Sequence, residues 1–562
     1  MARSRGRWII LFLIIFFVFL MVLGTLASRV KEGSVLVVEL SGGIEEQKPA
    51  GTSGQLFGAD VTLLHNLLDA IDTAKDDKRI TGLVLRINPL GAGWAKVREL
   101  RDRVLEFRKS KKPTICYLNG DMLDNRQYYL ATACEQVWMV PTAPLGVTGM
   151  MAQAMFLRGT LDKLGVYPDI YGLKEYKTAR DFYTEKKFTP ANREMTESLL
   201  RSIYEQYLTE ASQARKTDRA HFEELVNKGP FLPQEALAAK LVDRAAYWDE
   251  VQDFFRQKNK EWRPVEVSRY INELDKSGAD TIAVVHATGV IAMGKSDFDP
   301  VFGDYIMGSD SVSSDLRRAR NDDNVKAIIL RVDSPGGSAV ASEVIRREVV
   351  LAQKKKPVIV SMSDVAGSGG YWIAMSADKI VAEPATLTGS IGVVFGKMNI
   401  SGLFNLVGLS TDHVATNENA TILWEQQNFT PAQREMVMKM MNDIYANFKK
   451  GVAEGRKMKE EDVERIGRGR VWTGAQGKEN GLVDEIGGFE RALALAKQMA
   501  KIAPDTKVRL VRFPVEKTLF ETLMERFGSQ VSVTGDLARR LRSAKDEAES
   551  VQARMPFDIV VR

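Results

Sequence analysis

Residues 327–338 read AIILRVDSPGGS, and residues 82–93 read GLVLRINPLGAG. In each stretch, a run of apolar residues leads directly into a turn that contains proline and glycine. A continuous apolar run of this length is typical of a strand in a parallel sheet that helices cover on both faces. The two stretches therefore predict the same kind of α/β unit at two places in the chain.

The similarity between these two places extends along most of the chain. Three more pairs of segments match, in the same order, at an offset of about 245 residues, which indicates an internal duplication. The pairs are VLVVELSGGI (35–44) with IAVVHATGVI (282–291), KKPTICYLNG (111–120) with KKPVIVSMSD (355–364), and FTPANREM (188–195) with FTPAQREM (429–436). We interpret the chain as one unit that is present twice.

Each copy alternates short runs rich in Val, Ile and Leu with longer stretches of helical periodicity. In the first copy, strands are expected near residues 35, 83, 114 and 136, and helices near 62, 95 and 127. This alternation predicts βαβ units and a parallel sheet. We divide the chain into 1–28 (a basic stub and an apolar segment), 29–265 (first copy), 266–513 (second copy) and 514–562 (a tail). The stretch 256–278 connects the copies, and helices are expected in the tail at 519–527 and 537–552.

The composition is that of a globular protein with more than one domain. The chain has 562 residues, of which 44% are apolar and 27% charged. Lys and Arg exceed Asp and Glu by 78 − 73 = 5, and no long basic block is present, so we exclude a nucleic-acid-binding protein. The sequence has no metal-binding cluster and no nucleotide-binding loop, so we expect no cofactor and no dependence on ATP.

The N-terminus departs from this globular pattern. Residues 8–26 are uncharged and almost wholly apolar, long enough at about 1.5 Å per residue to cross roughly 30 Å of hydrocarbon. Arg3, Arg5 and Arg7 precede them, which predicts a cytoplasmic N-terminus and an extracytoplasmic body. A cleaved signal peptide is the alternative, but the run is longer than usual and no A-x-A site follows it. We favour a retained transmembrane anchor.

The two cysteines, Cys116 and Cys134, are too few to build a fold on disulfides. Both lie in apolar runs, where a free cysteine behaves as a small buried apolar residue. We therefore expect two buried thiols. A disulfide between them is an alternative that nothing in the sequence supports.

A candidate nucleophile lies in the second copy, where the strand PVIVSM is followed by DVAGSGGYW (364–372) and a helical pattern. Ser368 is thus expected at a strand-to-helix turn, where a serine is exposed and backbone N–H groups can bind an oxyanion. Upstream, Asp333-Ser-Pro-Gly-Gly-Ser also follows a strand, and Gly336 and Gly337 have no Cβ to keep a substrate carbonyl away. Both loops should meet at the carboxyl edge of the sheet, where ligands bind.

The base for this serine is more easily a lysine than a histidine. The four histidines are His65, His221, His286 and His413, and structural or surface roles suit all of them, although His286 stays open as a neighbour of the site. A lysine that is neutral because it is buried can replace the histidine, as in Ser-Lys variants of the catalytic triad.

The two copies differ reciprocally at the candidate positions. Lys177 lies in YKTAR ahead of FTPANREM, whereas the equivalent stretch of the second copy, TNENAT (416–421), has no lysine. Conversely, Asn125 of the first copy aligns with Ser368 to within one residue. This pattern predicts one composite site, with Lys177 from one copy and Ser368 from the other. Taken alone, Lys177 would be a solvated charge and Ser390, in TLTGSIGV, a turn residue.

These motifs, taken together, make the chain resemble the family of signal peptide peptidase A, also called protease IV, in its long, duplicated bacterial form. The resemblance covers essentially the whole chain and rests on the anchor, the repeat and the motifs RVDSPGGS, DVAGSGGYW, TLTGSIGV and EYKTA. It implies an α/β fold of two tandem crotonase-like or Clp-protease-like domains behind one transmembrane helix. It implies Ser368 as nucleophile, Lys177 as general base and Ser390 as a hydrogen-bond partner of the lysine. Gly369 and one of Gly336 and Gly337 would form the oxyanion hole.

The resemblance also implies a homotetramer on the outer face of the inner membrane that degrades signal peptides and other hydrophobic peptides. Two departures stand out: Asp333 occupies a position where many members have Asn, and Asn88-Pro-Leu-Gly of the first copy lacks the paired glycines. Two rival hypotheses are a crotonase-type enzyme acting on acyl thioesters and a non-enzymatic membrane-associated scaffold. The expected extracytoplasmic location argues against the first, and the presence of both Ser368 and Lys177 argues against the second.

Overall fold

The computed structural model describes residues 30–50, 61–299, 303–515, 552–554 and 560–561. The predicted anchor, 8–26, lies outside these residues, and within them no helix is both long and apolar enough to cross a membrane.

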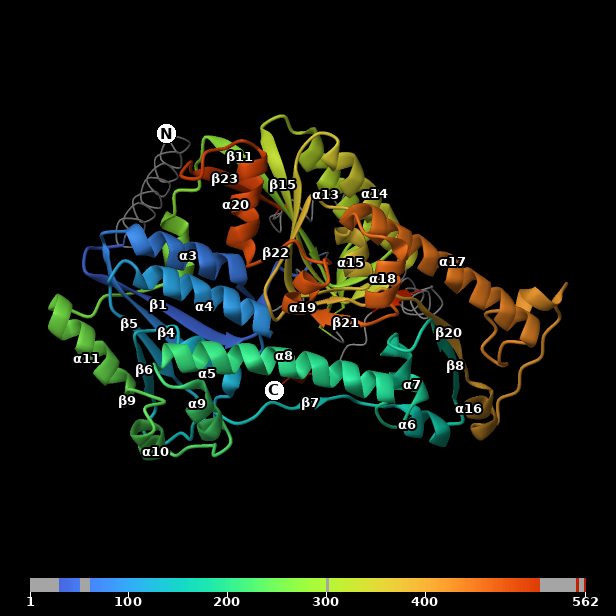
Figure 1. Ribbon diagram of the computed structural model, residues 1–562, viewed down its shortest axis with the longest axis horizontal. Helices are drawn as coiled ribbons and strands as arrows, with labels where there is room; N and C mark the ends of the chain where they lie inside the picture. The colour runs from blue at the N-terminus through green and yellow to red at the C-terminus, as the bar shows by residue number, and fades with distance from the viewer. Residues whose placement is uncertain (1–29, 51–60, 300–302, 516–551, 555–559, 562) are drawn as a thin grey trace, which may run out of the picture.

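The first copy contains a parallel sheet of six strands (Figure 1). The strand order is β10 (Pro264–Glu266), β1 (Ser34–Gly42), β4 (Ile80–Leu90), β5 (Thr114–Leu118), β6 (Gln136–Met139) and β9 (Arg244–Ala245). Each neighbouring pair is parallel. The helices between them are α3 (Leu64–Asp76), α4 (Trp94–Arg108) and α5 (Asn125–Ala131), so the predicted alternation of strands and helices is confirmed.

The second copy repeats this order. Its strands run β23 (Val508–Phe513), β11 (Asp280–Thr288), β15 (Val325–Ser334), β17 (Val358–Gly367), β18 (Lys379–Ala382) and β22 (Glu485–Ile486), again all parallel. Its helices are α13 (Ser309–Asn321), α14 (Ala339–Gln353) and α15 (Gly369–Ala374). Two further strands, β19 (Leu387–Gly389) and β21 (Val471–Thr473), extend the sheet beyond β17.

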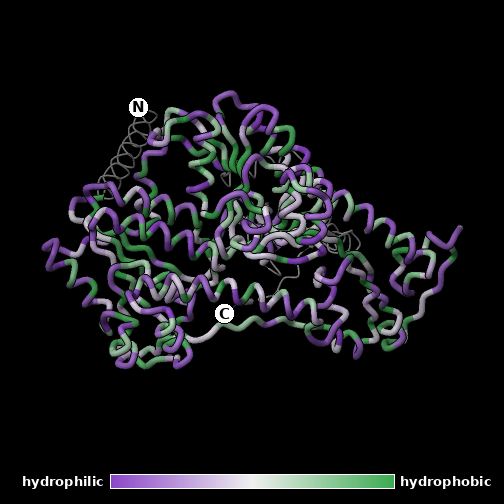
Figure 2. The backbone as a smooth tube through the Cα atoms, viewed as in Figure 1, coloured by the Kyte–Doolittle hydropathy of each residue, from purple (hydrophilic) through white to green (hydrophobic). Residues whose placement is uncertain are grey.

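Both faces of each sheet are covered, as the continuous apolar strands predict. In the second copy, Val285, Leu330 and Val360 pack on one face with helices α13 to α15, and Ile329 and Ile359 pack on the other face. That other face lies against α20 (Phe489–Met499), and the matching face of the first sheet lies against α11 (Trp248–Asn259). Figure 2 shows hydrophobic residues, in green, gathered in the interior of both copies.

Two elements of the first copy reach the second. Helix α8 (Pro190–Ala214) crosses the molecule in Figure 1 and packs against β21, where Ser202 Oγ lies 2.9 Å from Thr473 Oγ1. Strand β8 (Tyr167–Gly172) pairs antiparallel with β20 (Val394–Asn399). The two copies are therefore interlocked and not merely joined by a linker.

The pairing of β8 with β20 belongs to a third sheet. Its order is β13 (Asp297–Asp299), β14 (Asp304–Gly308), β12 (Val290–Ala292), β16 (Gly336–Ser338), β24 (Gln552–Arg554), β20 and β8. Strand β24 comes from the tail, so Gln552 lies in a strand and not in the helix that we expected to reach it. The backbone groups of β24 pair with the glycine strand β16, which accounts for the extended conformation. The rest of that expected helix, and the one at 519–527, lie outside the described residues.

The other strands and helices of the described residues include the long helix α17 and several short elements. The remaining strands are β2 (Ile44–Glu45), β3 (Thr62–Leu63), β7 (Ala152–Gln153) and β25 (Val560–Val561). The remaining α-helices are α6 (Arg158–Lys163), α7 (Asp181–Thr184), α9 (Arg219–Val226), α10 (Pro233–Ala238), α12 (Val267–Tyr270), α16 (Ser401–Leu406), α17 (Pro431–Arg456), α18 (Glu460–Ile466) and α19 (Gly474–Glu479).

The two cysteines are bonded to each other. Cys116 lies in β5 and Cys134 follows α5, and their Cα atoms are 5.7 Å apart, within the ordinary range for a disulfide. The expectation of two free thiols was wrong, although both residues are buried as predicted. The βαβ crossover brings the two Cα atoms together, which the sequence separation of 18 residues does not reveal.

Candidate active site

The predicted strand-to-helix turn is present at Ser368. Strand β17 ends at Gly367 and helix α15 begins at Gly369, with Ser368 between them at φ 53° and ψ −112°. Few residues other than glycine adopt positive φ, and such strain is concentrated at functional sites. The turn is held on both sides, because the Ser368 N–H donates to Gly389 O and its carbonyl accepts from Trp372 N, each at 2.8 Å.

Lys177 of the first copy reaches this serine. It lies between β8 and the 3₁₀ turn Thr178–Arg180, and its Nζ is 2.7 Å from Ser368 Oγ. The same Nζ lies 3.0 Å from Ser390 Oγ and 3.1 Å from Ser390 O. All three residues are fully buried. The expectation of an exposed serine was wrong, because Lys177 of the first copy packs against the Ser368 hydroxyl. The structure therefore brings together Ser368, Lys177 and Ser390, which are far apart in the sequence.

Burial changes the protonation of the lysine. It holds the pKa of Lys177 well below its ordinary value, because the charged ammonium loses its hydration. None of the described residues forms an ion pair with Lys177 that would oppose this effect. A neutral amine has two N–H groups and one lone pair, and the two oxygens of Ser390 account for the N–H groups. The lone pair is then available to the Ser368 hydroxyl.

Two glycines of the second copy, Gly392 and Gly469, leave room for Lys177 of the first copy. Neither was predicted as a site residue. A Cβ on Gly469 would lie 2.4 Å from Lys177 N, and one on Gly392 would lie 3.1 Å from Lys177 Cδ. The neighbouring Tyr176 N donates to Arg468 O at 3.2 Å. Gly392 lies in the motif TLTGSIGV, but nothing in the sequence marks Gly469 as a contact of the lysine.

The predicted glycine loop lies beside the serine. A Cβ on Gly369 would lie 3.1 Å from both Gly336 Cα and Gly337 N, so the two loops are in contact. Gly336 and Gly337 have φ values of 104° and 152°, which L-residues rarely adopt. The Gly336 N–H already donates to Ser334 Oγ at 3.2 Å. Gly337 is itself paired in the sheet, with Ile291 of β12 and Ala553 of β24. Gly369, directly after the serine, and Gly337 are the two glycines that we consider further as donors to an oxyanion.

Asp333, one of the two departures from the family pattern, is largely buried beside this loop, with 13% of its side chain exposed. Its Oδ1 accepts from Val365 N at 3.1 Å, and its Oδ2 lies 2.8 Å from Nζ of Lys96 in the first copy. Burial raises the pKa of Asp333 to about 6, against the opposing effect of Lys96. The carboxyl group of Asp333 therefore links β15 to β17 and the second copy to Lys96 of the first copy. An asparagine could accept the hydrogen bond from Val365 N but could not form the ion pair with Lys96.

The histidines do not contact the serine. His221 and His413 are exposed, and His65 and His286 are neighbours of each other, with ring centroids 6.0 Å apart. Burial lowers the pKa of His286 to about 4. Within the described residues, the hydrogen-bond partner of Ser368 Oγ is Lys177, so the open alternative of His286 as the base has no geometric support.

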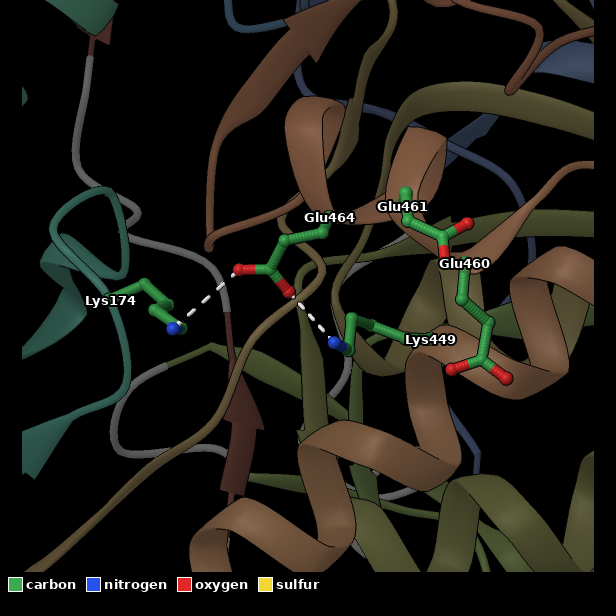
Figure 3. Close-up of a pocket in the computed structure, with 5 residues that line it drawn as sticks. All are labelled: Lys174, Lys449, Glu460, Glu461 and Glu464. Carbon is green, nitrogen blue, oxygen red and sulfur yellow. Dashed lines mark ion pairs between the residues drawn. The ribbon is translucent and has the colours of Figure 1, made fainter.

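A charged pocket lies near the lysine segment but does not include the serine (Figure 3). It is lined by Lys174, Lys449, Glu460, Glu461 and Glu464. Glu464 forms ion pairs with Lys449 at 2.8 Å and with Lys174 at 3.6 Å. Both lysines of this pocket are thus paired with Glu464, and we assign the pocket no catalytic role.

Comparison with known proteins identifies the class of protein to which the chain belongs. A relative from Arabidopsis thaliana named "Serine protease SPPA, chloroplastic" is 35% identical over 94% of this chain and 78% of its own length. "Protease 4" from Salmonella typhi is 33% identical over 97% of this chain and 90% of its own. "Protease 4" from Haemophilus influenzae is 32% identical over 78% of this chain and 73% of its own. The chain is a serine peptidase, which sets aside the two rival hypotheses.

The family is also identified by its own sequence model. Residues 106–261 and 351–503 each match the model described as peptidase family S49, one match in each copy. The chain belongs to peptidase family S49, in its duplicated form. A ClpP1 mutant from Listeria monocytogenes matches with 15% identity over 38% of this chain and 94% of its own, and its TM-score of 0.24 supports no inference.

Proposed function

We propose that Ser368 and Lys177 form a catalytic dyad that hydrolyses peptide bonds. The observation that carries this proposal is the 2.7 Å contact between the serine Oγ and the Nζ of a fully buried lysine. A general base must be within hydrogen-bond reach of the proton that it removes, and its pKa must lie near the working pH. Lys177 meets the first condition, and its lowered pKa supports the second.

In this mechanism, neutral Lys177 takes the proton of the Ser368 hydroxyl as Oγ attacks the carbonyl carbon of the substrate. The tetrahedral oxyanion accepts hydrogen bonds from the N–H groups of Gly369 and Gly337. Protonated Lys177 then gives its proton to the leaving amine, the C–N bond breaks, and an acyl-enzyme forms. Water then hydrolyses the acyl-enzyme. Lys177 takes a proton from water, the resulting hydroxide attacks the ester carbonyl carbon, and the bond between this carbon and Ser368 Oγ breaks. Lys177 finally returns the proton to Ser368 Oγ.

Ser390 would position the lysine rather than react. Its Oγ and its carbonyl accept the two N–H groups of the neutral amine, which directs the lone pair of Nζ at Ser368. Ser390 itself has φ 53°, and its N–H donates to Arg470 O at 2.7 Å. The backbone around Ser390 is therefore held while the proton moves.

We propose that the substrate binds as an extended strand along β16. Strand β24 of the tail supports this pose: Gly336, Gly337 and Ser338 pair antiparallel with Arg554, Ala553 and Gln552. Such addition of a strand to a sheet edge is a general mode of peptide recognition. The relative from Enterococcus faecium named "Putative signal peptide peptidase SppA", 33% identical over 34% of this chain, supports signal peptides and other hydrophobic peptides as the substrates.

We also propose that residues 8–26 anchor the enzyme in the inner membrane, with the N-terminus cytoplasmic and the body extracytoplasmic, as a homotetramer. The apolar segment and the preceding arginines support the anchor, and the resemblance to the family supports the tetramer. Light scattering of the detergent-solubilised chain measures its mass. A monomer that is fully active would exclude the tetramer as the working state.

The dyad is tested by labelling the full-length protein with a fluorophosphonate and mapping the adduct by mass spectrometry. We expect a single adduct at Ser368 that is lost in Ser368→Ala and in Lys177→Ala. A Lys174→Ala variant is the matched control, because Lys174 lies three residues away and is partly exposed. A folded wild-type protein without any adduct would refute the nucleophile, and an adduct that persists in Lys177→Ala would refute the base.

A further inference from the structure

Helix α4 of the first copy begins without a capping side chain of its own. Its N-cap residue is Gly93, which adopts an ordinary extended conformation with φ −76° and ψ 174°. The first N–H groups of a helix have no partner within the helix, and a side chain at the N-cap ordinarily accepts hydrogen bonds from the second and third of them. Gly93 cannot do so.

Asp364 of the second copy takes over this function. Its Oδ1 accepts from Ala95 N and Lys96 N, each at 3.0 Å, and its Oδ2 accepts from Gly93 N at 3.1 Å. Ala95 and Lys96 are the second and third residues of α4, the two that an N-cap side chain would serve. The carboxylate also interacts favourably with the positive end of the helix dipole.

The absence of a side chain at Gly93 is a consequence of this contact. A Cβ on Gly93 would lie 2.3 Å from Asp364 Cγ and 2.4 Å and 2.5 Å from its two oxygens. The backbone angles of Gly93 suit any residue, so the glycine is not required by conformation. It is required because the carboxylate of Asp364 occupies the space of a capping side chain.

The duplication shows that this arrangement is specific to one copy. The residue equivalent to Gly93 in the second copy is Ser338, which caps its own helix α14 by accepting from Ala341 N at 3.3 Å. The residue equivalent to Asp364 in the first copy is Gly120. The second copy thus caps its helix α14 with its own Ser338, whereas helix α4 of the first copy is capped by Asp364 of the second copy.

A second contact extends the link to the glycine loop. Lys96, the third residue of α4, places its Nζ 2.8 Å from Asp333 Oδ2 and 3.7 Å from Asp364 Oδ2. Asp333 precedes Gly336 on the strand that leads to the candidate oxyanion hole. Burial lowers the pKa of Lys96, but Asp333, Asp364 and Glu46 raise it by more, so its charge is retained.

We propose that Asp364 is a positioning residue that holds the nucleophile strand at its working distance from the copy that carries Lys177. The inference rests on the proposed dyad. Asp364 lies four residues before Ser368 on β17, and its three hydrogen bonds fix this strand end to α4 of the copy that supplies the lysine. A displacement of about 1 Å between reacting groups can cost on the order of 100-fold in rate.

The test compares Asp364→Ala with the double variant Gly93→Ser/Asp364→Ala. In the double variant, a serine at 93 caps α4 from within the first copy, in space that the carboxylate has left. Tm and hydrogen exchange of the Ala95 and Lys96 amides report the cap without any need for activity. The values of kcat and KM, and the rate of fluorophosphonate labelling at Ser368, report the alignment.

For Asp364→Ala we expect faster amide exchange, a lower Tm and a kcat that falls roughly 10- to 100-fold with KM changed less than about 2-fold. For the double variant we expect the exchange and Tm to recover while kcat and labelling stay low. Asp364→Asn, which keeps an acceptor for Ala95 and Lys96, should fall between wild type and Asp364→Ala.

Recovery of kcat together with Tm in the double variant would overturn the inference, because the cap would then be purely structural. An unchanged kcat in Asp364→Ala would overturn it as well. If Asp364→Ala does not fold, the double variant alone decides, since its kcat is then compared directly with wild type. A wild-type protein that is not labelled at Ser368 refutes the proposed function instead, which keeps the two failures distinct.

Discussion

The two copies use the same strand position for different purposes. Arg331 on β15 and Arg86 on β4 are equivalent in the repeat. Arg331 is buried and donates to Glu46 and Glu99 of the first copy, with ion-pair distances of 2.8 Å to each. Arg86 is about one-third exposed, lies 3.8 Å from Glu39 and packs over the ring of Trp248. The contact between copies, and not the strand, decides what the arginine does.

The same contrast applies to the chemistry. The second copy has the nucleophile turn and the paired glycines, and the first copy has the lysine. The first copy's Asn125, equivalent to Ser368 to within one residue, is buried and accepts from Thr148 N at 3.1 Å. In the first copy, this position thus has a structural hydrogen bond in place of a nucleophile. The two copies together supply one candidate site.

We expect the largest effect from substituting Ser368 and Lys177, which tests whether the two copies contribute to one catalytic unit. Ser368→Ala and Lys177→Ala should each lower kcat/KM for a hydrophobic peptide by at least about 1,000-fold, because each removes one member of a unit. The double variant should lose no more than either single variant. Asn125→Ala, the matched change in the first copy, should leave kcat/KM within about 3-fold. Additive losses in the double variant would mean that the two residues act separately.

The next effect compares the two arginines. Arg331→Met should lower the free energy of unfolding by about 3–5 kcal/mol, because it leaves Glu46 and Glu99 buried without their partner. Arg86→Met should cost less than about 1 kcal/mol, since its ion pair is long and partly exposed. Urea denaturation of both variants measures the difference. Equal losses would show that the burial of Arg331 contributes nothing specific to the contact between copies.

A third prediction concerns pH. The pKa of Lys177 is lowered in the folded protein and about 10.4 in the unfolded chain. Between these values the unfolded chain binds the extra proton, so the free energy of unfolding should rise with pH by at most about 1.4 kcal/mol per unit. Denaturation at several pH values should show this rise in wild type and in Lys174→Ala but not in Lys177→Ala.

The activity gives a second readout of the same group. The value of kcat/KM should increase as pH rises through the lowered pKa of Lys177, because the neutral amine is the active form. An activity that increases only near pH 10 would mean that Lys177 titrates as an ordinary lysine. The proposed base would then have to be abandoned.

The smallest expected effect concerns the tail, which belongs to neither copy. Strand β24 pairs with the glycine strand of the second copy, where we propose that substrates bind. Removing residues 552–562 should lower KM for a hydrophobic peptide by about 2- to 5-fold, because a tethered competitor is lost. Removing only 560–562, which takes away β25 and its pairing with β7, should leave KM unchanged. A higher KM without β24 would indicate that the tail helps to build the site.

Much of the fold could be predicted because its signals are local. The strands near 35, 83, 114 and 136 are continuous apolar runs, and they form β1, β4, β5 and β6. The turn at Ser368 could be predicted in the same way, since a strand, a glycine-flanked serine and a helical pattern follow one another. The disulfide and strand β24 could not be predicted, because each depends on where distant segments meet.

The candidate site could be predicted only through the repeat and the family resemblance. Lys177 has lysine neighbours in sequence, and its burial follows from contacts with Gly469 and Gly392 of the other copy. The cap of α4 by Asp364 has no local signal either, because Gly93 by itself indicates only a turn. Both features require the two copies to be in their places.

The sequence by itself determined the duplicated α/β unit, the division of candidate residues between the copies and the serine at its turn. Local periodicity and turn chemistry specify these features without reference to the rest of the molecule. Only the tertiary structure decided that the lysine is buried against the serine and that a carboxylate of one copy caps a helix of the other. Burial and distance are properties of the packed interface, where residues about 190 to 270 positions apart become neighbours.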